Sequence, residues 1–169
     1  ELLNYIELRK LLIDDGYKFL TTSDTEVLLN SYINWGVGLL QKIKGMFAFA
    51  IWDSKQNTLI LARDRFGIKP LYYFNTDSGV IFGSEIKALL ASGIISKEIN
   101  ENSLHEYIWY GNALGSNTIF NGIHKLLPGH YMKIHSGIIE MHEYWAIQHI
   151  QEIREDVKHV EKIVFKKLE

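Results

Sequence analysis

Few side chains have types and spacing that could support chemistry, and the first of them is a carboxylate. Residues 23–26 read Ser-Asp-Thr-Glu, the spacing of a capping box, so Asp24 brings a negative charge to the positive end of a helix. From this pattern alone its role is helix capping. Cysteine is absent from the 169 residues, which excludes a cysteine nucleophile, a disulfide and a thiolate zinc site within them.

Histidines and a short run of charges are two further candidates. His135, His142 and His149 recur every seven residues, but they fall across a hairpin and a linker, and this is not a metal-ligand spacing. We therefore expect no metal site. The run 63–65 reads Arg-Asp-Arg, and in a strand its two arginines share one face while Asp64 takes the other. We interpret it as structural ion pairing at the end of a sheet, with contact to a neighbouring domain as the alternative.

Length and composition indicate a soluble globular chain of one domain, or one domain with a short extension. Hydrophobic residues make up 47% of it and charged residues 22%, which is ordinary for such proteins. The formal net charge of −2 gives no electrostatic reason to expect nucleic acid or an anionic membrane as a partner. No apolar run approaches the roughly 20 residues that span a bilayer. With no signal peptide and no cysteine, we expect a cytoplasmic protein.

The strands that position these residues follow from the apolar pattern. Residues 46–53 carry apolar side chains on both faces, so we predict a strand that is covered on both sides at the centre of a layered fold. Residues 58–62 pair with it as an antiparallel hairpin. A second pair is predicted at 71–74 and 80–82, across a turn. Further strands are predicted at 118–120, 130–134 and 138–144.

Helices are predicted before and after these strands, in groups. Their predicted spans begin at the caps Asn4, Ser23, Ser84 and Asn100, with a short helix at 39–44. From Ile150 to Leu168 the apolar residues are spaced by three and four, which predicts an amphipathic helix. Antiparallel strands with grouped helices indicate an α+β layered sandwich.

Several longer motifs share the spacing of one family. They lie at residues 4–9, 16–19, 23–29, 32–36, 45–53, 61–73, 82–90, 128–131 and 144–145. On these residues the chain resembles the class II glutamine amidotransferase domain of glutamine-hydrolysing asparagine synthetases. The resemblance covers about residues 1–145, and it implies that 146–169 form a linker and the first helix that lead to a missing synthetase domain.

The resemblance implies a fold and a reaction. The fold would be an N-terminal-nucleophile hydrolase-like four-layer αββα sandwich with antiparallel sheets, here truncated at both ends and lacking its first strands. In this family an N-terminal cysteine hydrolyses glutamine, with its own α-amine as the base. The ammonia passes to a C-terminal domain, where ATP activates aspartate for conversion to asparagine. The chain would be a fragment of the ammonia-supplying half.

The resemblance also implies which residues bind glutamine. Asp24 would bind the α-ammonium group, and Glu1 would be a second contact beside it. As a chain terminus in this fragment, Glu1 is expected to be frayed and without a role. The family's cysteine would stand upstream of Glu1, so we expect no catalytic residue, no cofactor and no glutaminase activity in these residues. ATP and Mg²⁺ would belong to the synthetase domain.

Two alternatives stay open. The parent could be a related amidotransferase that amidates another carboxylate, such as a sugar acid or a peptide, because such enzymes share this half. The gene could instead be truncated, and its product a catalytically dead remnant or an interaction module. If the flanking DNA encodes an upstream Met-Cys-Gly start and a downstream Ser-Gly-Gly-x-Asp-Ser loop, the hypothesis of a truncated remnant is excluded. Exposed sheet edges and apolar faces also predict self-association or poor stability, so a homo-oligomer stays open as well.

Overall fold

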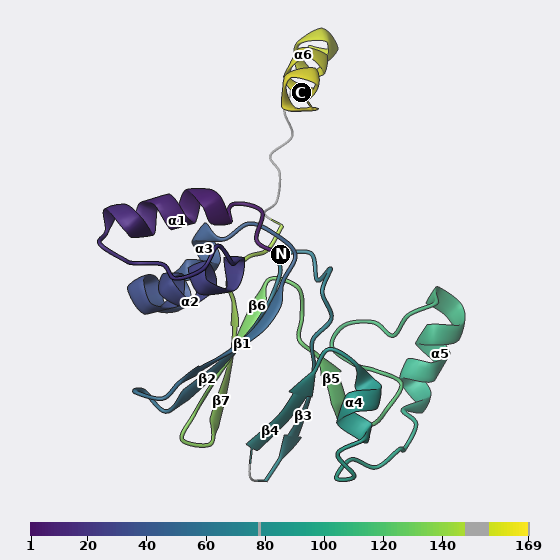
Figure 1. Cartoon of the computed structure of the whole chain (residues 1–169). Coiled ribbons are helices and arrows are strands. Elements are labelled where there is room, and N and C mark those ends of the chain that lie inside the picture. Colours follow the sequence, from purple (N-terminus) through teal and green to yellow (C-terminus); the bar gives the residue numbers. More distant parts are fainter. Residues whose placement is uncertain (78, 148–155, 169) are drawn as a thin grey trace.

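Two antiparallel sheets pack face to face between helices (Figure 1). The computed structural model describes residues 1–77, 79–147 and 156–168, with side chains up to residue 166. Among these residues the first sheet has the strand order β1-β2-β6-β7 and the second has the order β4-β3-β5. The strands of the first sheet are β1 (Ala48–Asp53), β2 (Thr58–Arg63), β6 (His130–His135) and β7 (Ile138–Glu143). Those of the second are β3 (Tyr72–Thr76), β4 (Gly79–Gly83) and β5 (Ile123–Lys125).

Helices cover the outer faces of both sheets. Four lie over the first sheet: α1 (Tyr5–Asp14), α2 (Asp24–Trp35), the 3₁₀ turn η1 (Gly36–Gly38) and α3 (Leu39–Lys42). Beside the second sheet lie α4 (Ile86–Leu90) and α5 (Glu101–Tyr110). In Figure 1, α6 (Val157–Leu168) stands apart from both sheets. It confirms the predicted amphipathic helix from Val157 onward, whereas residues 150–155 lie outside the described part. No helix in the described ranges is long and apolar enough to cross a membrane.

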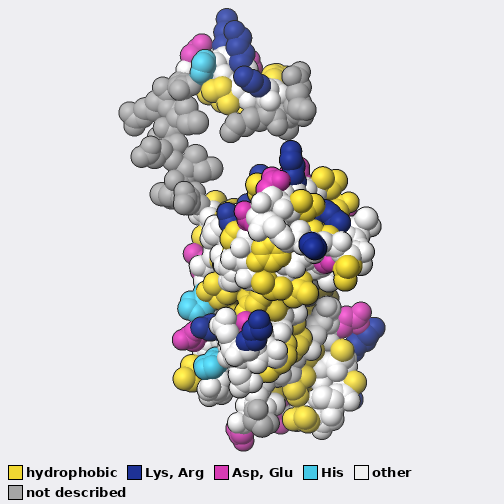
Figure 2. Space-filling view, turned by 60° about the vertical axis from the view of Figure 1, so that its left-hand side comes forward, with side chains coloured by type: hydrophobic (Ala, Val, Ile, Leu, Met, Phe, Trp, Pro, Cys, Tyr) yellow, Lys and Arg dark blue, Asp and Glu magenta, His cyan; other side chains and the backbone are white. Residues whose placement is uncertain are grey.

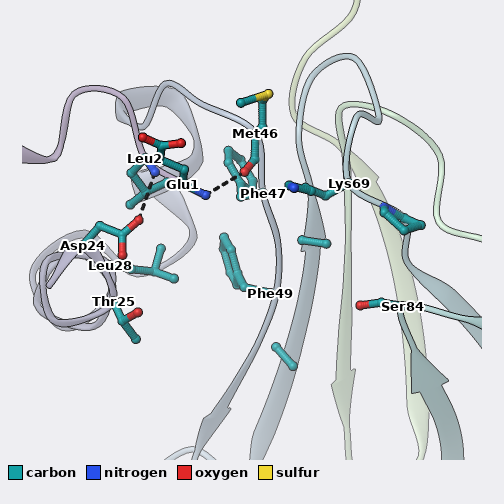
Figure 3. A pocket seen from close by; sticks show the side chains of 13 residues that line it. Glu1, Leu2, Asp24, Thr25, Leu28, Met46, Phe47, Phe49, Lys69 and Ser84 are labelled. Carbon is teal, nitrogen blue, oxygen red and sulfur yellow. Dashed lines mark hydrogen bonds between the residues drawn. The ribbon is translucent and has the colours of Figure 1, made fainter. Parts of the chain in front are cut away.

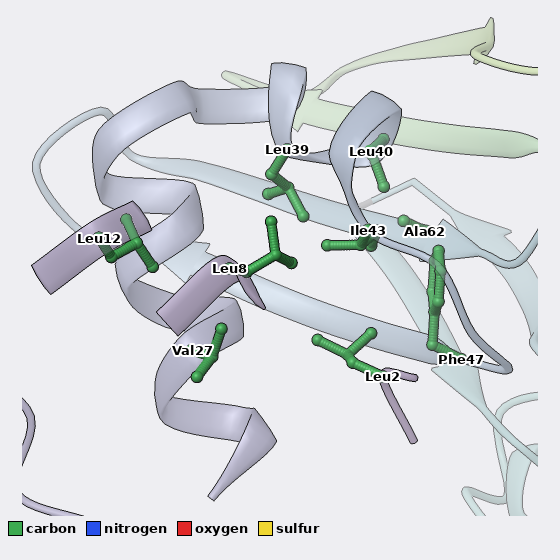
Figure 4. Packing of buried hydrophobic residues seen from close by; sticks show 9 residues of the cluster. All are labelled: Leu2, Leu8, Leu12, Val27, Leu39, Leu40, Ile43, Phe47 and Ala62. Atoms are coloured by element: carbon green, nitrogen blue, oxygen red, sulfur yellow. The ribbon is translucent and has the colours of Figure 1, made fainter. Parts of the chain in front are cut away.

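Three buried clusters hold these layers together. The first lies between the helices α1, α2 and α3 and the outer face of the first sheet (Figure 4), and it includes Leu12 and Val27, both 0% exposed. The second lies between the two sheets and includes Leu61 and Met132. The third packs α4 on the second sheet through Leu89. The order of layers is therefore helix, sheet, sheet, helix, which confirms the predicted αββα sandwich.

The prediction that residues 46–53 form a central strand covered on both faces was wrong. In the described residues β1 is the edge strand of its sheet, and Trp52 is 59% exposed. The strand buried on both faces is β2, where Ile60, Leu61 and Ala62 are at most 2% exposed. β2 has β1 and β6 as neighbours. An apolar pattern shows that a strand can be covered, but it does not identify the neighbours that cover it.

One predicted cap and one predicted strand were also wrong, and a second cap was correct in position only. Asn4 is the N-cap residue of α1, but its side chain makes no capping bond; it donates to Lys42 O and accepts from Lys44 N. The N-cap of α4 is the residue after Ser84, and no side chain caps that helix. Residues 118–120 form no strand, and Phe120 makes only an isolated antiparallel bridge with Ile99.

Ser23 caps α2 as predicted, but the hydrogen bonds differ from those of the predicted capping box. The Ser23 hydroxyl accepts from Thr25 N at 3.0 Å. Glu26 does not return to Ser23 as in a capping box, since its carboxylate accepts the backbone N–H groups of Leu20 and Thr21, each at 2.7 Å. The hydrogen bond that the Thr21 hydroxyl donates to Glu26, followed by these backbone bonds, lowers the pKa of Glu26. These bonds fix the chain that leads into α2, so the first residue of the helix, Asp24, has a defined position.

Candidate functional site

The loop after β2 brings one wall of the site into place, and Asp64 organises this loop. Asp64 is only 1% exposed. Its carboxylate accepts four backbone N–H groups at 3.0–3.3 Å, those of Phe47, Phe66, Ile68 and Lys69. Hydrogen bonds to a charged acceptor are stronger than neutral ones. Asp64 therefore folds residues 64–69 around its side chain and ties them to the start of β1.

Arg63 supports the same loop from the other side. Its guanidinium donates to Lys69 O at 2.8 Å, Gly67 O at 2.7 Å and Leu126 O at 2.6 Å. Burial lowers the pKa of Arg63, against the attraction of Asp64, which raises it. The predicted ion pairing was wrong, because within the described ranges no ion pair joins residues 63–65. The partners of Arg63 and Asp64 are backbone groups instead.

Residues 1–3 form a second wall by pairing with residues 44–46. Glu1 N donates to Met46 O at 2.9 Å and Met46 N donates to Glu1 O at 3.1 Å. Leu2, at 3% exposure, belongs to the core of the first layer. The expectation of a frayed Glu1 was therefore wrong for its backbone. Gly45 permits this close approach, since its φ is +150° and a Cβ there would collide with Glu1 O.

The site itself is a pocket of about 480 Å³ at the start of α2 (Figure 3). Asp24 Oδ2 accepts the Leu2 N–H at 3.1 Å, which places Asp24 beside Glu1 on one side. Lys69 and Ser84 lie on the opposite side. The structure thus brings together both residues that the sequence predicted for the site.

Charged groups line both sides of this pocket, and the α-ammonium group of Glu1 lies on the Asp24 side. Asp24 and Glu1 supply two carboxylates, and Lys69 supplies an ammonium group across from them. Asp24 Oδ1 accepts no hydrogen bond from the described residues, so it is available to a ligand. The two carboxylates suit a cationic group such as an amino acid's ammonium. No histidine lines the pocket to act as a base for the Ser84 or Thr25 hydroxyl in the described part of the chain.

Sequence reasoning missed three residues that line this pocket. Thr25 follows Asp24 in the same helical turn, and this adjacency could have identified it. Ser84 was assigned to a cap, and Lys69 was not considered. Both come from the side of the second sheet, so no spacing along the chain relates them to Asp24.

The histidines of the described residues do not gather at a site. His135 Nδ1 lies 3.2 Å from the Thr58 hydroxyl, and His142 Nε2 lies 3.5 Å from a Glu140 carboxylate oxygen. His149 lies outside the described residues. Across the residues that the structure describes, no group of three or more histidine, cysteine or acidic residues could hold a metal ion.

Comparison with known proteins identifies the family. The glutamine amidotransferase domain family matches residues 1–145. "Asparagine synthetase [glutamine-hydrolyzing] 3" of Bacillus subtilis is 42% identical, over 88% of this chain and 24% of its own length. "Amidase chry2" of Gibberella zeae is 34% identical, over 96% of this chain and 24% of its own length. The chain therefore spans about a quarter of the length of the curated relatives it matches.

A solved structure shows the same fold. Glutamine phosphoribosylpyrophosphate amidotransferase from B. subtilis superposes with a TM-score of 0.58 at 21% identity, over 87% of this chain and 28% of that one. This likeness concerns the fold, and it confirms the predicted N-terminal-nucleophile hydrolase-like sandwich. With the match over residues 1–145, the conclusion is that this chain belongs to the glutamine amidotransferase domain family.

Proposed function

We propose that this chain is the glutamine-binding part of a glutamine-dependent asparagine synthetase, from the half that supplies ammonia. Asp24 binds the α-ammonium group of glutamine, and Glu1 is the second contact. One observation carries this proposal: the Asp24 carboxylate, held by the Leu2 N–H at 3.1 Å, lies beside Glu1 in a pocket of about 480 Å³. The printed names of the similar asparagine synthetases support it.

The electrostatics of the pocket favour a cation on the Asp24 side. The N-terminus of α2 contributes roughly half a positive charge, which would repel an ammonium group. The Asp24 carboxylate contributes a full negative charge at the helix start and outweighs it, while the charge of the Glu1 carboxylate is offset by the α-ammonium group of the same residue, which donates to Met46 O. An ammonium group has three donors, enough to reach both carboxylates at once.

The rest of the reaction would take place outside these residues. The parent would convert ATP, aspartate and glutamine to asparagine and glutamate in the cytoplasm. Hydrolysis of glutamine would need a cysteine that the 169 residues do not contain. The ATP and Mg²⁺ chemistry would belong to a C-terminal synthetase domain, the expected intramolecular partner of this one.

Replacing Asp24 by asparagine (Asp24→Asn) is expected to weaken glutamine binding about 10- to 100-fold. The substitution removes a charged acceptor of the ammonium group, and hydrogen bonds to charged groups are worth about 1.5–3 kcal/mol. Binding is measured by titrating the ¹⁵N-labelled chain with glutamine and following the amide shifts of residues 24–28.

The control for this measurement is Asp14→Asn at the exposed end of α1. It removes the same charge outside the pocket and is expected to leave binding unchanged. Equal affinities for the two variants would exclude Asp24 as the ammonium ligand. A wild-type chain that shows no saturable shifts would mean that Asp24 and Glu1 are insufficient for binding.

The chain by itself is expected to release no ammonia from glutamine above the rate in buffer. In the described residues no histidine lines the pocket to activate the Ser84 or Thr25 hydroxyl, and cysteine is absent. Ammonia is measured by coupling to glutamate dehydrogenase, with Asp24→Asn purified in parallel. Ammonia release that Asp24→Asn abolishes would contradict the prediction, whereas release that both proteins show equally would come from a contaminant.

A second candidate function concerns the acceptor. Relatives named as amidases, chry2 and chyE, are each 34% identical to this chain, nearly as similar as some of the synthetases. The parent could therefore amidate a carboxylate other than aspartate. Assay of the full-length protein with aspartate and with other carboxylates distinguishes the two. The third possibility, a catalytically dead remnant or interaction module, is tested by the DNA on either side of this segment.

A further inference from the structure

The chain leaves the domain beside the loop that forms one wall of the pocket. The family match ends at residue 145, and α6 stands apart from the sheets in Figure 1 and also in Figure 2, which shows the molecule from another side. Just before this exit, Tyr144 and Trp145 both contact residues 63–66, where the loop begins. We call Gly129, Tyr144 and Trp145 together the exit anchor.

Backbone hydrogen bonds join the exit anchor to the loop. Gly129 O accepts the N–H groups of Tyr144 at 2.8 Å and of Trp145 at 3.2 Å, and Gly129 N donates to Asp64 O at 3.0 Å. Gly129 is buried with a φ of +67°, and a Cβ there would collide with Trp145 O. The close approach of the two backbones therefore requires glycine. One buried residue connects the exit of the chain to Asp64, which organises the loop.

Two side chains of the exit anchor add contacts on either side of Asp64. The Tyr144 hydroxyl donates to Arg63 O at 2.8 Å. Burial raises the pKa of this hydroxyl, so it remains a donor at neutral pH. The Trp145 ring meets the Phe66 ring edge to face, with the centroids 5.1 Å apart. Phe66 is 68% exposed, so its ring has few neighbours, and Trp145 is one of them.

The anchored loop carries part of the pocket wall. The amides of Phe66 and Lys69 both donate to the Asp64 carboxylate, at 3.1 and 3.0 Å. Lys69 lines the pocket on the side opposite Asp24 (Figure 3). Phe47 also lines it, and its N–H and C=O both bond to Asp64. A displacement of Phe66 is therefore transmitted to Lys69 through a single carboxylate.

We propose that Tyr144 and Trp145 are positioning residues of the glutamine site. They hold the loop at 64–69 in place, and with it Lys69, which faces Asp24 across the pocket. The proposal rests on the function proposed above for Asp24. Neither Tyr144 nor Trp145 lines the pocket, so both act through the loop and not through contact with the ligand.

Hydrogen exchange of single amides tests the hold on the loop, and it requires no glutamine. Trp145→Ala removes the ring that contacts Phe66 and is expected to speed exchange at Ile68 and Lys69 about five- to tenfold. Trp145→Phe keeps an aromatic ring there and is expected to stay within about twofold of the wild type. Tyr144→Phe removes only the hydroxyl and is expected to speed the same exchange about threefold.

The control for these variants is Trp109→Ala. Trp109 of α5 is 83% exposed and lies outside the pocket and the exit anchor, so its removal is expected to leave exchange at Ile68 and Lys69 unchanged. Exchange at these two amides that is the same in Trp145→Ala as in the wild type would overturn the proposal. The same acceleration in Trp109→Ala would overturn it as well.

Glutamine affinity tests the effect on the site. Titration of the ¹⁵N-labelled chains is expected to show about fivefold weaker binding for Trp145→Ala, and wild-type binding for Trp145→Phe and Trp109→Ala. Urea unfolding verifies that each variant is folded under the conditions of the titration. Faster loop exchange with unchanged affinity in Trp145→Ala would overturn the positioning role. A wild-type chain that binds no glutamine would overturn the function proposed for Asp24 instead, and hydrogen exchange would still decide whether Trp145 holds the loop.

Discussion

Replacing Asp64 by asparagine (Asp64→Asn) is expected to lower the free energy of unfolding by about 4 kcal/mol. The carboxylate accepts four backbone N–H groups, two on each oxygen. In asparagine one oxygen becomes an NH₂ group, which faces two of these donors without accepting from them. Each buried donor that loses its acceptor costs about 1–3 kcal/mol. The large expected effect comes from the concentration of four backbone bonds on one buried side chain.

Urea unfolding followed by far-ultraviolet circular dichroism measures this loss. The control is Asp14→Asn, an exposed carboxylate for which the same change is expected to stay within about 0.5 kcal/mol. The loop at 66–69 should also lose protection against hydrogen exchange at Ile68 and Lys69, whose amides bond to Asp64. A loss below about 1 kcal/mol would show that the loop finds other acceptors, and that Asp64 does not organise it.

The parts of the fold that depend on local pattern were predictable from the sequence. The hairpins β1–β2, β3–β4 and β6–β7 follow from apolar runs separated by polar turns. The cap of α5 at Asn100 is confirmed, since its side chain accepts from Ser103 N at 3.1 Å. Caps and hairpins involve neighbours in the chain, and neighbouring residue types are sufficient to specify them.

Features that depend on distant partners were not predictable. β5 has three residues and exists because β3 pairs with it. The charges of residues 63–65 suggested ion pairing at the end of a sheet, yet Asp64 is satisfied by the backbone N–H groups of Phe47 and of the loop up to Lys69. The sequence around Asp64 does not indicate that the partners of its carboxylate are backbone N–H groups, because a carboxylate between two arginines suggests ion pairs.

Some residues of the candidate site could likewise be predicted from the sequence, and others could not. Asp24 and Glu1 were identified by resemblance to a family, and the structure brings them together through the Leu2 N–H. Their role as glutamine ligands remains a prediction. Lys69 and Ser84 reach the same pocket only because the loop after β2 and the second sheet face α2 across it. Their contribution depends on how the layers pack, which no spacing along the chain encodes.

Replacing Gly45 by alanine (Gly45→Ala) is expected to lower the free energy of unfolding by about 2–4 kcal/mol and to weaken the glutamine site. At φ +150° an added Cβ collides with Glu1 O and lies 3.0 Å from Leu2 Cα, so residues 1–3 must leave their place. Leu2 then loses its burial, worth about 1.5–3 kcal/mol, and the strained backbone adds about 1–3 kcal/mol where it persists. Urea unfolding gives the stability, and hydrogen exchange at Met46 reports the loss of its bond to Glu1.

Gly38→Ala is the matched control, because Gly38 has a helical φ of −61° and ordinary space around its Cβ. It is expected to be neutral or slightly stabilising. If Gly45→Ala acts by moving residues 1–3, it removes Glu1 and the Leu2 N–H from Asp24 together. Glutamine affinity of the double variant with Asp24→Asn should then fall by less than the product of the two single effects. Full additivity would mean that the pairing of residues 1–3 with 44–46 does not position the ammonium site.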